Sequence, residues 1–391
     1  MNAPSQMSAQ QLSAQNNAAR AAVLASSVPM FQQVYSNVIQ PANTPQINIP
    51  PQNVGLIRGF MLKLSATITN PSSGSSTLSL TSGGPSNLLQ SIVFTDLQNY
   101  QRINTSGWHL SLLNSAKQGR PFLSSTASDS PMGYGSNYTV IKAPSTIAAN
   151  TAGTINMFYW IPLAYHQNVL SGAIWANVVN ATMNLQLNFA NAAQAVVANT
   201  ADPTLAIYQG AGAVAGVTLT NVNITLYQDY LDQLPMQNGQ AILPAMDLNT
   251  IYELKNTSFN AIPTAQDFNI AYSNFRHFLS TSVIFDNQTG GAYPTAGSDV
   301  NFWSFRTANA TDMRKCDPFT WSGMTRRKIQ TDAPGGWYYF DTRDKPIFTT
   351  QTGNTNLVLN ASTVNTGAQC LVGWEMFANV SNILGAASLA S

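Results

Sequence analysis

Charge is scarce in this sequence. Asp, Glu, Lys and Arg make up 8% of its 391 residues, whereas roughly a quarter of an ordinary soluble domain is charged. The formal net charge is +1, so the chain has no global field to hold a polyanion, and like-charge repulsion between copies adds little to its solubility. This balance favours a protein that packs against copies of itself, and it argues against a specific nucleic-acid partner.

Cysteines and long apolar runs are also scarce. Cys316 and Cys370 are too few for a disulfide framework and too far apart for a zinc or redox motif. We therefore expect two free thiols and a reducing compartment. No uninterrupted apolar run reaches the roughly 18 residues of a membrane span, and no basic segment leads into an apolar one at the N-terminus. We expect neither a membrane-crossing helix nor a secretion signal.

The sequence lacks the common motifs of catalysis. Its three histidines are scattered and have no His-x-x-x-His or Cys-x-x-Cys companions, so a metal site is not expected. It has neither a G-x-x-x-x-G-K-[ST] phosphate loop nor a G-x-S-x-G elbow. A glycosidase pair of carboxylates remains conceivable among Asp229, Asp232 and Asp247. We expect no enzymatic activity, no cofactor and no metal.

Short alternating runs fill most of the chain after about Pro41. In "TMNLQLNF", residues 182–189, apolar side chains alternate with uncharged polar ones, and "GFMLKLSATI", residues 59–68, repeats the pattern. A period of two is typical of strands with one buried face. Many short strands without regular helices between them predict an all-β antiparallel sandwich or barrel. Further strands are expected at 154–161, 222–227, 268–272, 300–305, 337–340, 357–359 and 370–377.

A few helices are expected between the strands. One lies at 105–119 and ends at a glycine, a second at 168–176, and a third begins after Asp317, a good N-cap followed by proline. The chain thus reads strand, helix, strand at 154–189 and again at 300–340. The two similar blocks indicate two domains of similar construction.

Residues 1–40 form a separate segment that is rich in Ala and Gln and almost devoid of charge. Its middle should be helical, but its apolar stripe of Leu12, Ala19 and Val23 is thin. A helix this weak needs a partner surface to be stable. The segment is either an arm docked on a neighbouring subunit or lipid, or a frayed terminus.

The sparse charge is concentrated in one stretch. Seven of the 17 basic and five of the 16 acidic residues lie in 312–345. Arg326, Arg327 and Lys328 could contact phosphates, but they occupy the last turn of the expected helix, where cations offset the helix dipole. Because five aspartates lie in the same stretch, a mixed-charge joint is favoured. Helical rotation directs Arg326 and Arg327 away from the apolar stripe, toward another surface.

Several longer segments carry a family resemblance. The sequence from about residue 53 to 377 resembles the major capsid protein of tectiviruses, which are tailless icosahedral phages with a membrane inside the protein shell. The resemblance rests on these segments, in order: "SGWHL", "NSAKQGRPFLSS", "YWIPLAY", "AIYQGAGA", "YLDQLP", "RTAN", "TRRKIQTD" and "TRDKPI". It implies a double jelly roll, two eight-stranded sandwiches in one subunit, with a few short helices and an N-terminal helical arm.

The resemblance also implies a function and a division of the chain. We expect a homotrimer of nearly hexagonal footprint that tiles the virion's capsid shell around an internal membrane, with minor capsid and vertex proteins as further partners. The expected parts are an arm at 1–45, a first jelly roll at 46–242, a second at 243–380 and a tail at 381–391. Candidate contacts to neighbouring capsomers or membrane are Leu12, Arg20, Val23, Arg326, Arg327 and Lys328.

Two other functions remain open at this point. The chain could be a trimeric receptor- or glycan-binding spike, in which exposed aromatic residues such as Trp175 or Tyr134 stack on a ligand. It could also be a secreted polysaccharide hydrolase that uses the carboxylates named above. A coat protein that catalyses nothing is favoured, because the low charge suits surfaces that become buried against copies of the same chain.

Overall fold

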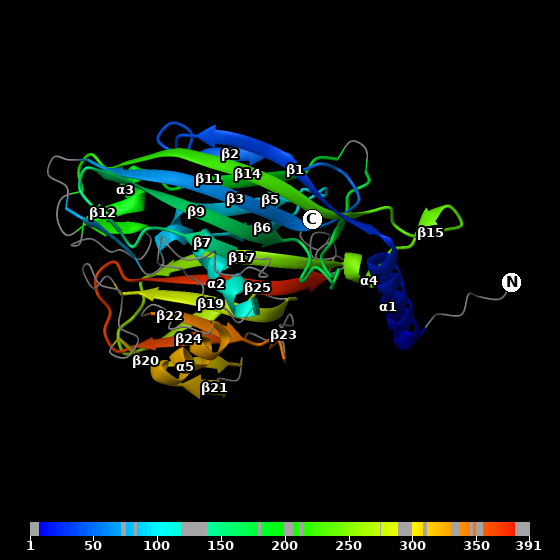
Figure 1. The fold of residues 1–391 in the computed structure, drawn as a ribbon. Coiled ribbons are helices and arrows are strands. Elements are labelled where there is room, and N and C mark those ends of the chain that lie inside the picture. The colour runs from blue at the N-terminus through cyan, green and yellow to red at the C-terminus, as the bar shows by residue number, and fades with distance from the viewer. Residues whose placement is uncertain are drawn as a thin grey trace.

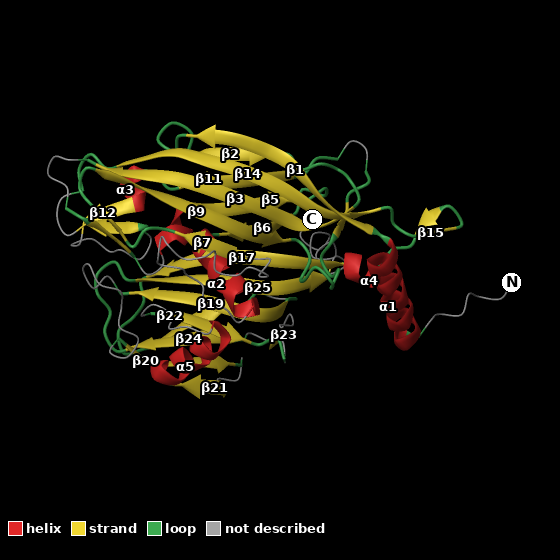
Figure 2. Ribbon diagram, viewed as in Figure 1, coloured by secondary structure: helices red, strands yellow, loops and turns green. Residues whose placement is uncertain are grey.

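The computed structural model describes most of the chain, and strands dominate it (Figure 2). Statements about structure concern these residues only. They are 8–71, 76–81, 84–118, 139–178, 181–198, 206–210, 214–273, 275–287, 299–307, 311–329, 336–344, 347–348 and 355–379.

The first half of the chain forms two sheets that pack face to face (Figure 1). One has the strand order β1-β14-β3-β9-β7, with β10 paired to β3, and the other begins β2-β11-β5-β6. Phe60 on β3 and Phe94 on β5 meet between them, with ring centroids 5.5 Å apart. The bounds are β1 Val28–Ile39, β2 Gln46–Ile49, β3 Leu56–Asn70, β5 Leu89–Thr95, β6 Gln101–Thr105, β7 Thr139–Lys142, β9 Thr151–Pro162, β10 Ile174–Trp175, β11 Asn184–Phe189 and β14 Thr218–Asp232.

The second half continues one of these sheets. β6 pairs in parallel with β17, so the sheet runs on as β17-β25-β19-β22. A second core lies between this extension and a sheet of order β18-β24-β20-β21. The bounds are β17 Thr250–Asn260, β18 Asp267–Ala271, β19 His277–Asp286, β20 Val300–Arg306, β21 Asp312–Cys316, β22 Trp337–Asp341, β24 Asn356–Ala361 and β25 Gln369–Asn379.

Smaller elements complete the fold. The strands β12, β13, β4 and β8 form a minor sheet, β15 and β16 form a hairpin, and β23 pairs with β19. Their bounds are β4 Leu78–Leu80, β8 Thr146–Ile147, β12 Val196–Ala198, β13 Tyr208–Gly210, β15 Met236–Gln237, β16 Gln240–Ala241 and β23 Ile347–Phe348. The helices are α1 Ala9–Ser26, η1 Gly84–Leu88, α2 Gly107–Gln118, α3 Ala192–Ala195, α4 Ala245–Leu248 and α5 Pro318–Ile329.

The predicted alternation of strands is confirmed. The apolar residues of residues 59–68 line the core from β3, while Lys63 and its polar neighbours face outward. Each half forms a sandwich of two sheets, as the sequence predicted: among the described residues the second has eight strands in β17-β25-β19-β22 and β18-β24-β20-β21, whereas β7 and β10 add to the eight of the first. Cys370 is buried in the second core, in agreement with its place in an apolar row of β25.

Two of the three predicted internal helices are confirmed. α2 spans residues 107–118, and α5 begins after Asp317, whose carboxylate accepts a hydrogen bond from the Thr320 amide at 3.0 Å. The helix predicted at 168–176 is wrong. That segment holds turns and β10, because Gly172 adopts a positive φ of 94°, which does not occur within an α-helix. The block at 154–189 therefore is not strand, helix, strand.

The middle of residues 1–40 is helical, as the sequence predicted. α1 begins at a capping box of Ser8 and Gln11 and ends at Ser26. Residues 28–39 are not helical: they form β1, which pairs along nearly its whole length with β14. The sequence did not reveal β1 because this strand lies at the edge of its sheet and is largely exposed, so its apolar residues do not alternate clearly.

Candidate functional site

The three carboxylates considered as a catalytic pair, Asp229, Asp232 and Asp247, either form ion pairs within the chain or are exposed. Asp229 is buried and accepts a hydrogen bond from Arg58 at 2.5 Å; burial raises the pKa of Asp229, although Arg58 opposes the shift. Asp247 pairs with Arg20, and Asp232 is exposed at the end of β14. No group of three or more His, Cys, Asp and Glu side chains that could hold a metal ion occurs among the described residues.

The N-terminal helix is fixed to its own chain. Arg20 donates two hydrogen bonds to Asp247, from Nε at 2.6 Å and from Nη2 at 2.7 Å. Ser171 donates to the same carboxylate at 2.9 Å, and the Asn16 side chain accepts from the Met246 amide. Val23 is fully buried in a small apolar cluster with residues of β3 and β14. Arg20 and Val23 therefore hold the arm at the segment that links the two halves.

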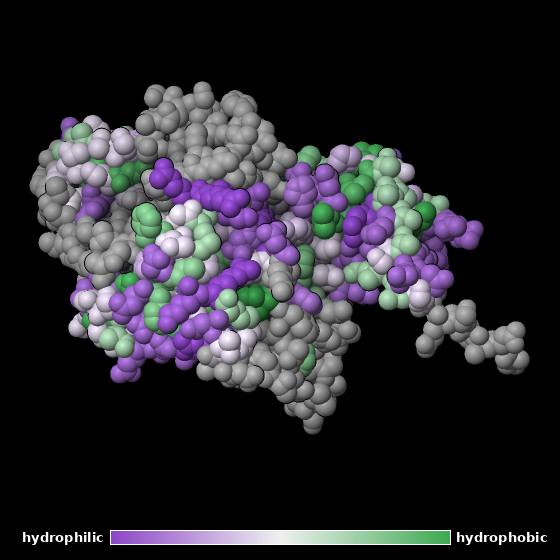
Figure 3. Space-filling model, turned by 90° about the horizontal axis from the view of Figure 1, so that it is seen from below, coloured by the Kyte–Doolittle hydropathy of each residue, from purple (hydrophilic) through white to green (hydrophobic). Residues whose placement is uncertain are grey.

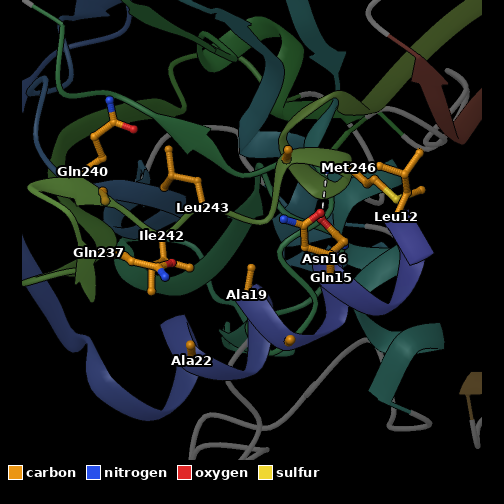
Figure 4. A pocket seen from close by; sticks show the side chains of 13 residues that line it. Leu12, Gln15, Asn16, Ala19, Ala22, Gln237, Gln240, Ile242, Leu243 and Met246 are labelled. Atoms are coloured by element: carbon orange, nitrogen blue, oxygen red, sulfur yellow. Dashed lines mark hydrogen bonds between the residues drawn. The ribbon is translucent and has the colours of Figure 1, made fainter. Parts of the chain in front are cut away.

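A groove of about 560 Å³ runs between α1 and residues 237–246. Figure 4 shows Ala19 and Ala22 of α1 on one side and Ile242 and Leu243 on the other, with the hydrogen bond from the Met246 backbone to Asn16 at one end. Leu12 lies at that end and is 44% exposed. The apolar stripe of the arm is thus only partly covered by its own chain. No helix in the described part of the chain is long and apolar enough to cross a membrane.

A buried ion pair joins the two halves. Lys117 on α2 lies 2.6 Å from Glu375 on β25, and neither side chain is more than 8% exposed. Glu375 also accepts hydrogen bonds from Tyr252 at 2.8 Å and Ser280 at 2.6 Å. Burial alone would raise the pKa of Glu375, but the charges of Lys117 and Arg343 hold it below its ordinary value. The carboxylate is thus ionised and fully surrounded by partners.

Close packing accompanies the ion pair. The ring of Trp108 on α2 meets Trp337 on β22 edge to face, with centroids 6.0 Å apart. His109 lies against Gly373 so closely that a Cβ at Gly373 would stand 2.4 Å from the imidazole ring. Burial lowers the pKa of His109 to about 4. α2 is therefore enclosed between the halves along almost its entire length.

The charge-rich stretch is largely paired within the chain, as the sequence predicted. Lys328 lies 2.6 Å from Asp341, which also binds Arg343 at 2.8 Å. Arg326 and Arg327 are exposed on α5. Whether they contact another surface stays a prediction, and so does the same role for Leu12 and Lys328. Figure 3 shows the molecule from below. On this side, hydrophilic residues are interspersed with small patches of hydrophobic residues.

Large apolar side chains are exposed at two opposite edges of the molecule. At the β1 edge they are Val28, Met30, Phe31 and Val38, and at the other edge they lie on β21 and α5, where Phe319 is 85% exposed. Figure 1 places β1 at one extreme and β21 with α5 at the other. The sequence analysis identified neither edge. Phe319 could have indicated one of them, because it is a large apolar residue in the first turn of a charged helix.

The sequence falls within known protein families. The family model "P3 major capsid protein N-terminal" matches residues 3–234, and "P3 major capsid protein C-terminal" matches residues 249–391. Major capsid protein P3 of Enterobacteria phage PRD1 is 46% identical over 382 residues, which cover 98% of this chain and 95% of the relative.

Solved structures share the fold. The crystal structure of the STIV MCP has a TM-score of 0.62 at 14% identity and covers 90% of this chain and 97% of its own. The atomic structure of Sulfolobus Turreted Icosahedral Virus gives a TM-score of 0.60 at 14% identity, with 90% of both chains covered. These likenesses confirm the double jelly roll.

Proposed function

The chain belongs to the P3 major capsid protein family, and from this premise we propose that three copies form a capsomer that tiles an icosahedral shell around an internal lipid membrane. The chain is a structural protein of the virion shell and not an enzyme. Its copies associate with one another in that shell. The trimer, its nearly hexagonal outline and the membrane are the parts of the proposal that go beyond family membership.

The observation that carries the trimer is the repetition inside one chain. The sheet orders β1-β14-β3-β9 and β2-β11-β5-β6 of the first half recur as β17-β25-β19-β22 and β18-β24-β20-β21 in the second. Three copies around one axis would present six similar sandwiches. Such a unit has a nearly hexagonal outline and can tile a flat facet, while ring closure keeps the assembly from growing as a filament.

The composition supports burial of large lateral surfaces. Removing charge from water is costly unless each charge is paired and hydrogen-bonded. Uncharged polar side chains such as Ser65, Thr67, Asn223 and Thr225 predominate on the outer face of β3 and β14, where Lys63 and, at the end of β14, Asp232 are exposed charged residues. A surface of this kind can be covered by another copy at low desolvation cost.

The parts of the chain receive proposed roles. We propose the limits given above, 46–242 and 243–380, for the two jelly rolls, with β1 added to the first. The arm would lie at the inner side of the shell, where the exposed side of Leu12 contacts membrane or a neighbouring capsomer, while Arg20 and Val23 fix the arm in place. Minor capsid and vertex proteins would meet the shell at its vertices.

Two measurements test the proposal. Light scattering on the purified protein should give three times the chain mass of 42.0 kDa, and a persistent monomer at high concentration would contradict the trimer. Electron cryo-microscopy of particles should show a bilayer beneath a shell of hexagonal units. A shell of such units without a bilayer would overturn the membrane part alone.

A further inference from the structure

A second, smaller pocket of about 220 Å³ lies where β10 meets the end of β14. Its walls include Trp175 at the end of β10, Asn177 shortly after it, and Tyr230, Asp232 and Gln233 at the end of β14. The pocket thus combines two aromatic side chains with one carboxylate and two amides. None of these residues takes part in the ion pairs that fix the arm or the joint between the two halves.

The carboxylate of Asp232 is available for a ligand. It is exposed, and among the described residues it has no ion-pair or hydrogen-bond partner. Asp229, three positions earlier on the same strand, is buried and paired with Arg58. Asp232 is also the one charged residue among the described residues that line the pocket. The pocket therefore has a negative potential, which attracts a cation and disfavours a phosphate or carboxylate.

The aromatic residues suit the same kind of ligand. Of the seven tryptophans of the chain, six are buried and Trp175 alone is partly exposed. The Tyr230 hydroxyl donates a hydrogen bond to Gln32 on β1 at 3.3 Å, which holds that side chain in place. The faces of Trp and Tyr rings attract ammonium groups, and sites for such groups combine aromatic rings with a nearby negative charge.

The backbone beside the carboxylate is strained. Gln233 has a φ of 50°, in the left-handed region that residues other than glycine seldom adopt. Strain of this kind persists where the surrounding structure holds it, and it clusters at ligand sites. Leu234, the next residue, is buried in the apolar cluster that also contains Val23 of α1 and packs against Trp175. The packing that fixes the arm thus also fixes both sides of the pocket.

We infer that this pocket binds an organic ammonium group, which lies against Trp175 and pairs with Asp232. The amides of Asn177 and Gln233 are available to hydrogen-bond the atoms next to the ammonium group. The group can belong to a lipid headgroup, such as choline or ethanolamine, or to a free amine. The pocket lies at the end of the molecule that α1 occupies (Figure 1). Binding itself depends on neither the proposed trimer nor the proposed membrane.

The fluorescence of the full-length protein tests the inference. Because the other six tryptophans are buried, a saturable change in emission on titration with choline chloride reports on Trp175. Half-saturation is expected on the order of 10 mM, since one ring contact and one exposed ion pair stabilise the complex. Sodium chloride at equal ionic strength, and an uncharged analogue with a tert-butyl group in place of the trimethylammonium group, should give no saturable change.

Ligand-observed NMR extends the test to variants that lack the fluorescent reporter. Asp232→Asn should weaken choline binding about threefold, and Trp175→Leu about tenfold. Asp344→Asn is the matched control, because Asp344 is exposed outside the pocket, and should bind choline like the wild type. Absence of saturable binding to the wild type, equal binding of the uncharged analogue, or unchanged binding in both pocket variants would overturn the inference.

Vesicles distinguish the two sources of the ammonium group. If the ligand is a lipid headgroup, phosphatidylcholine vesicles should change the emission of Trp175 and compete with free choline, whereas phosphatidylglycerol vesicles should do neither. Binding of choline without a response to either vesicle would assign the pocket to a free amine, and would hold even if the virion had no membrane. A response to phosphatidylglycerol but not to phosphatidylcholine would contradict a cation site.

Discussion

Lys117 and Glu375 show how a charge-poor protein uses one of its few ion pairs. The pair lies at the joint, with Tyr252 and Ser280 filling the remaining hydrogen-bonding positions of the carboxylate. A buried pair with full satisfaction contributes little more than apolar residues of the same size would, but removing one partner leaves a buried charge. The pair therefore contributes more to the specific way in which the two halves pack together than to the free energy of folding.

A double-mutant cycle tests this view. Lys117→Met should lower the free energy of unfolding by about 3–5 kcal/mol, because Glu375 remains buried without its partner. Adding Glu375→Gln should restore a large part of the loss. Lys315→Ala is the control, since Lys315 is exposed and 3.8 Å from Asp312, and should cost less than about 1 kcal/mol. Urea denaturation measures the wild type, the single variants Lys117→Met and Glu375→Gln, the double variant and Lys315→Ala, and a double mutant no more stable than Lys117→Met would contradict the argument.

His109 should make the fold sensitive to mild acid. Burial lowers its pKa from 6.5 to about 4, and nearby Lys117 lowers it further while Glu375 opposes the shift. Since the folded pKa is depressed, the stabilisation is complete above pH 6.5 and is lost as pH falls toward 4. Between pH 7 and pH 5 the free energy of unfolding should drop by about 2 kcal/mol from this group.

The pH dependence of urea unfolding checks this expectation. His109→Gln should flatten the change between pH 7 and pH 5, whatever its effect on stability at neutral pH. His277→Gln serves as the control, because His277 is exposed at the start of β19, and should retain most of the slope. Equal slopes in the wild type and His109→Gln would show that another group causes the acid sensitivity.

At the scale of elements, α1 depends on a few polar contacts. Arg20 is its single charged residue, and its bidentate hydrogen bonds to the buried Asp247 fix the helix against the linker. We expect Arg20→Met to release the helix locally, with the opening free energy of residues 9–26 lowered by roughly 1–3 kcal/mol. Hydrogen exchange measures this directly. Gln10→Met, at an exposed position of the same helix, should leave protection unchanged, and unchanged protection in Arg20→Met would refute the role of the ion pair.

The boundary between α1 and β1 gives a second prediction at this scale. Deletion of residues 1–26 should leave both sandwiches folded, because α1 contacts them mainly through one small cluster. Deletion of residues 1–40 should not, because β14 loses a partner along the whole of β1 and its edge becomes free to aggregate. Thermal unfolding and solubility compare the two. A soluble, cooperatively melting 1–40 deletion would show that β1 belongs to an arm after all.

The same boundary shows what sequence patterns can reveal. Strands such as β3 were predictable because one face is buried and the other polar, so apolar residues alternate. β1 escaped because an edge strand has little buried surface, and the false helix at 168–176 arose because helical propensity was not weighed against Gly172. The ion pair of Lys117 with Glu375 could not be predicted from the sequence, because 258 positions separate the two residues and only the tertiary fold brings them together.

At the scale of the whole molecule, the basic residues of α5 could serve either the stability of the subunit or the association of copies. Lys328 pairs with Asp341 inside the chain, and Arg326 and Arg327 are exposed on the surface of α5. Arg326→Ala with Arg327→Ala should therefore weaken association and shell assembly more than it lowers the melting temperature of the subunit. Lys328→Ala, in the same turn, should do the reverse, with a small loss of stability of at most about 1 kcal/mol because its pair is partly exposed. Ultracentrifugation and calorimetry on the same preparations separate the effects, and a large melting shift of the double arginine variant with normal association would mean that these charges serve the subunit's own fold.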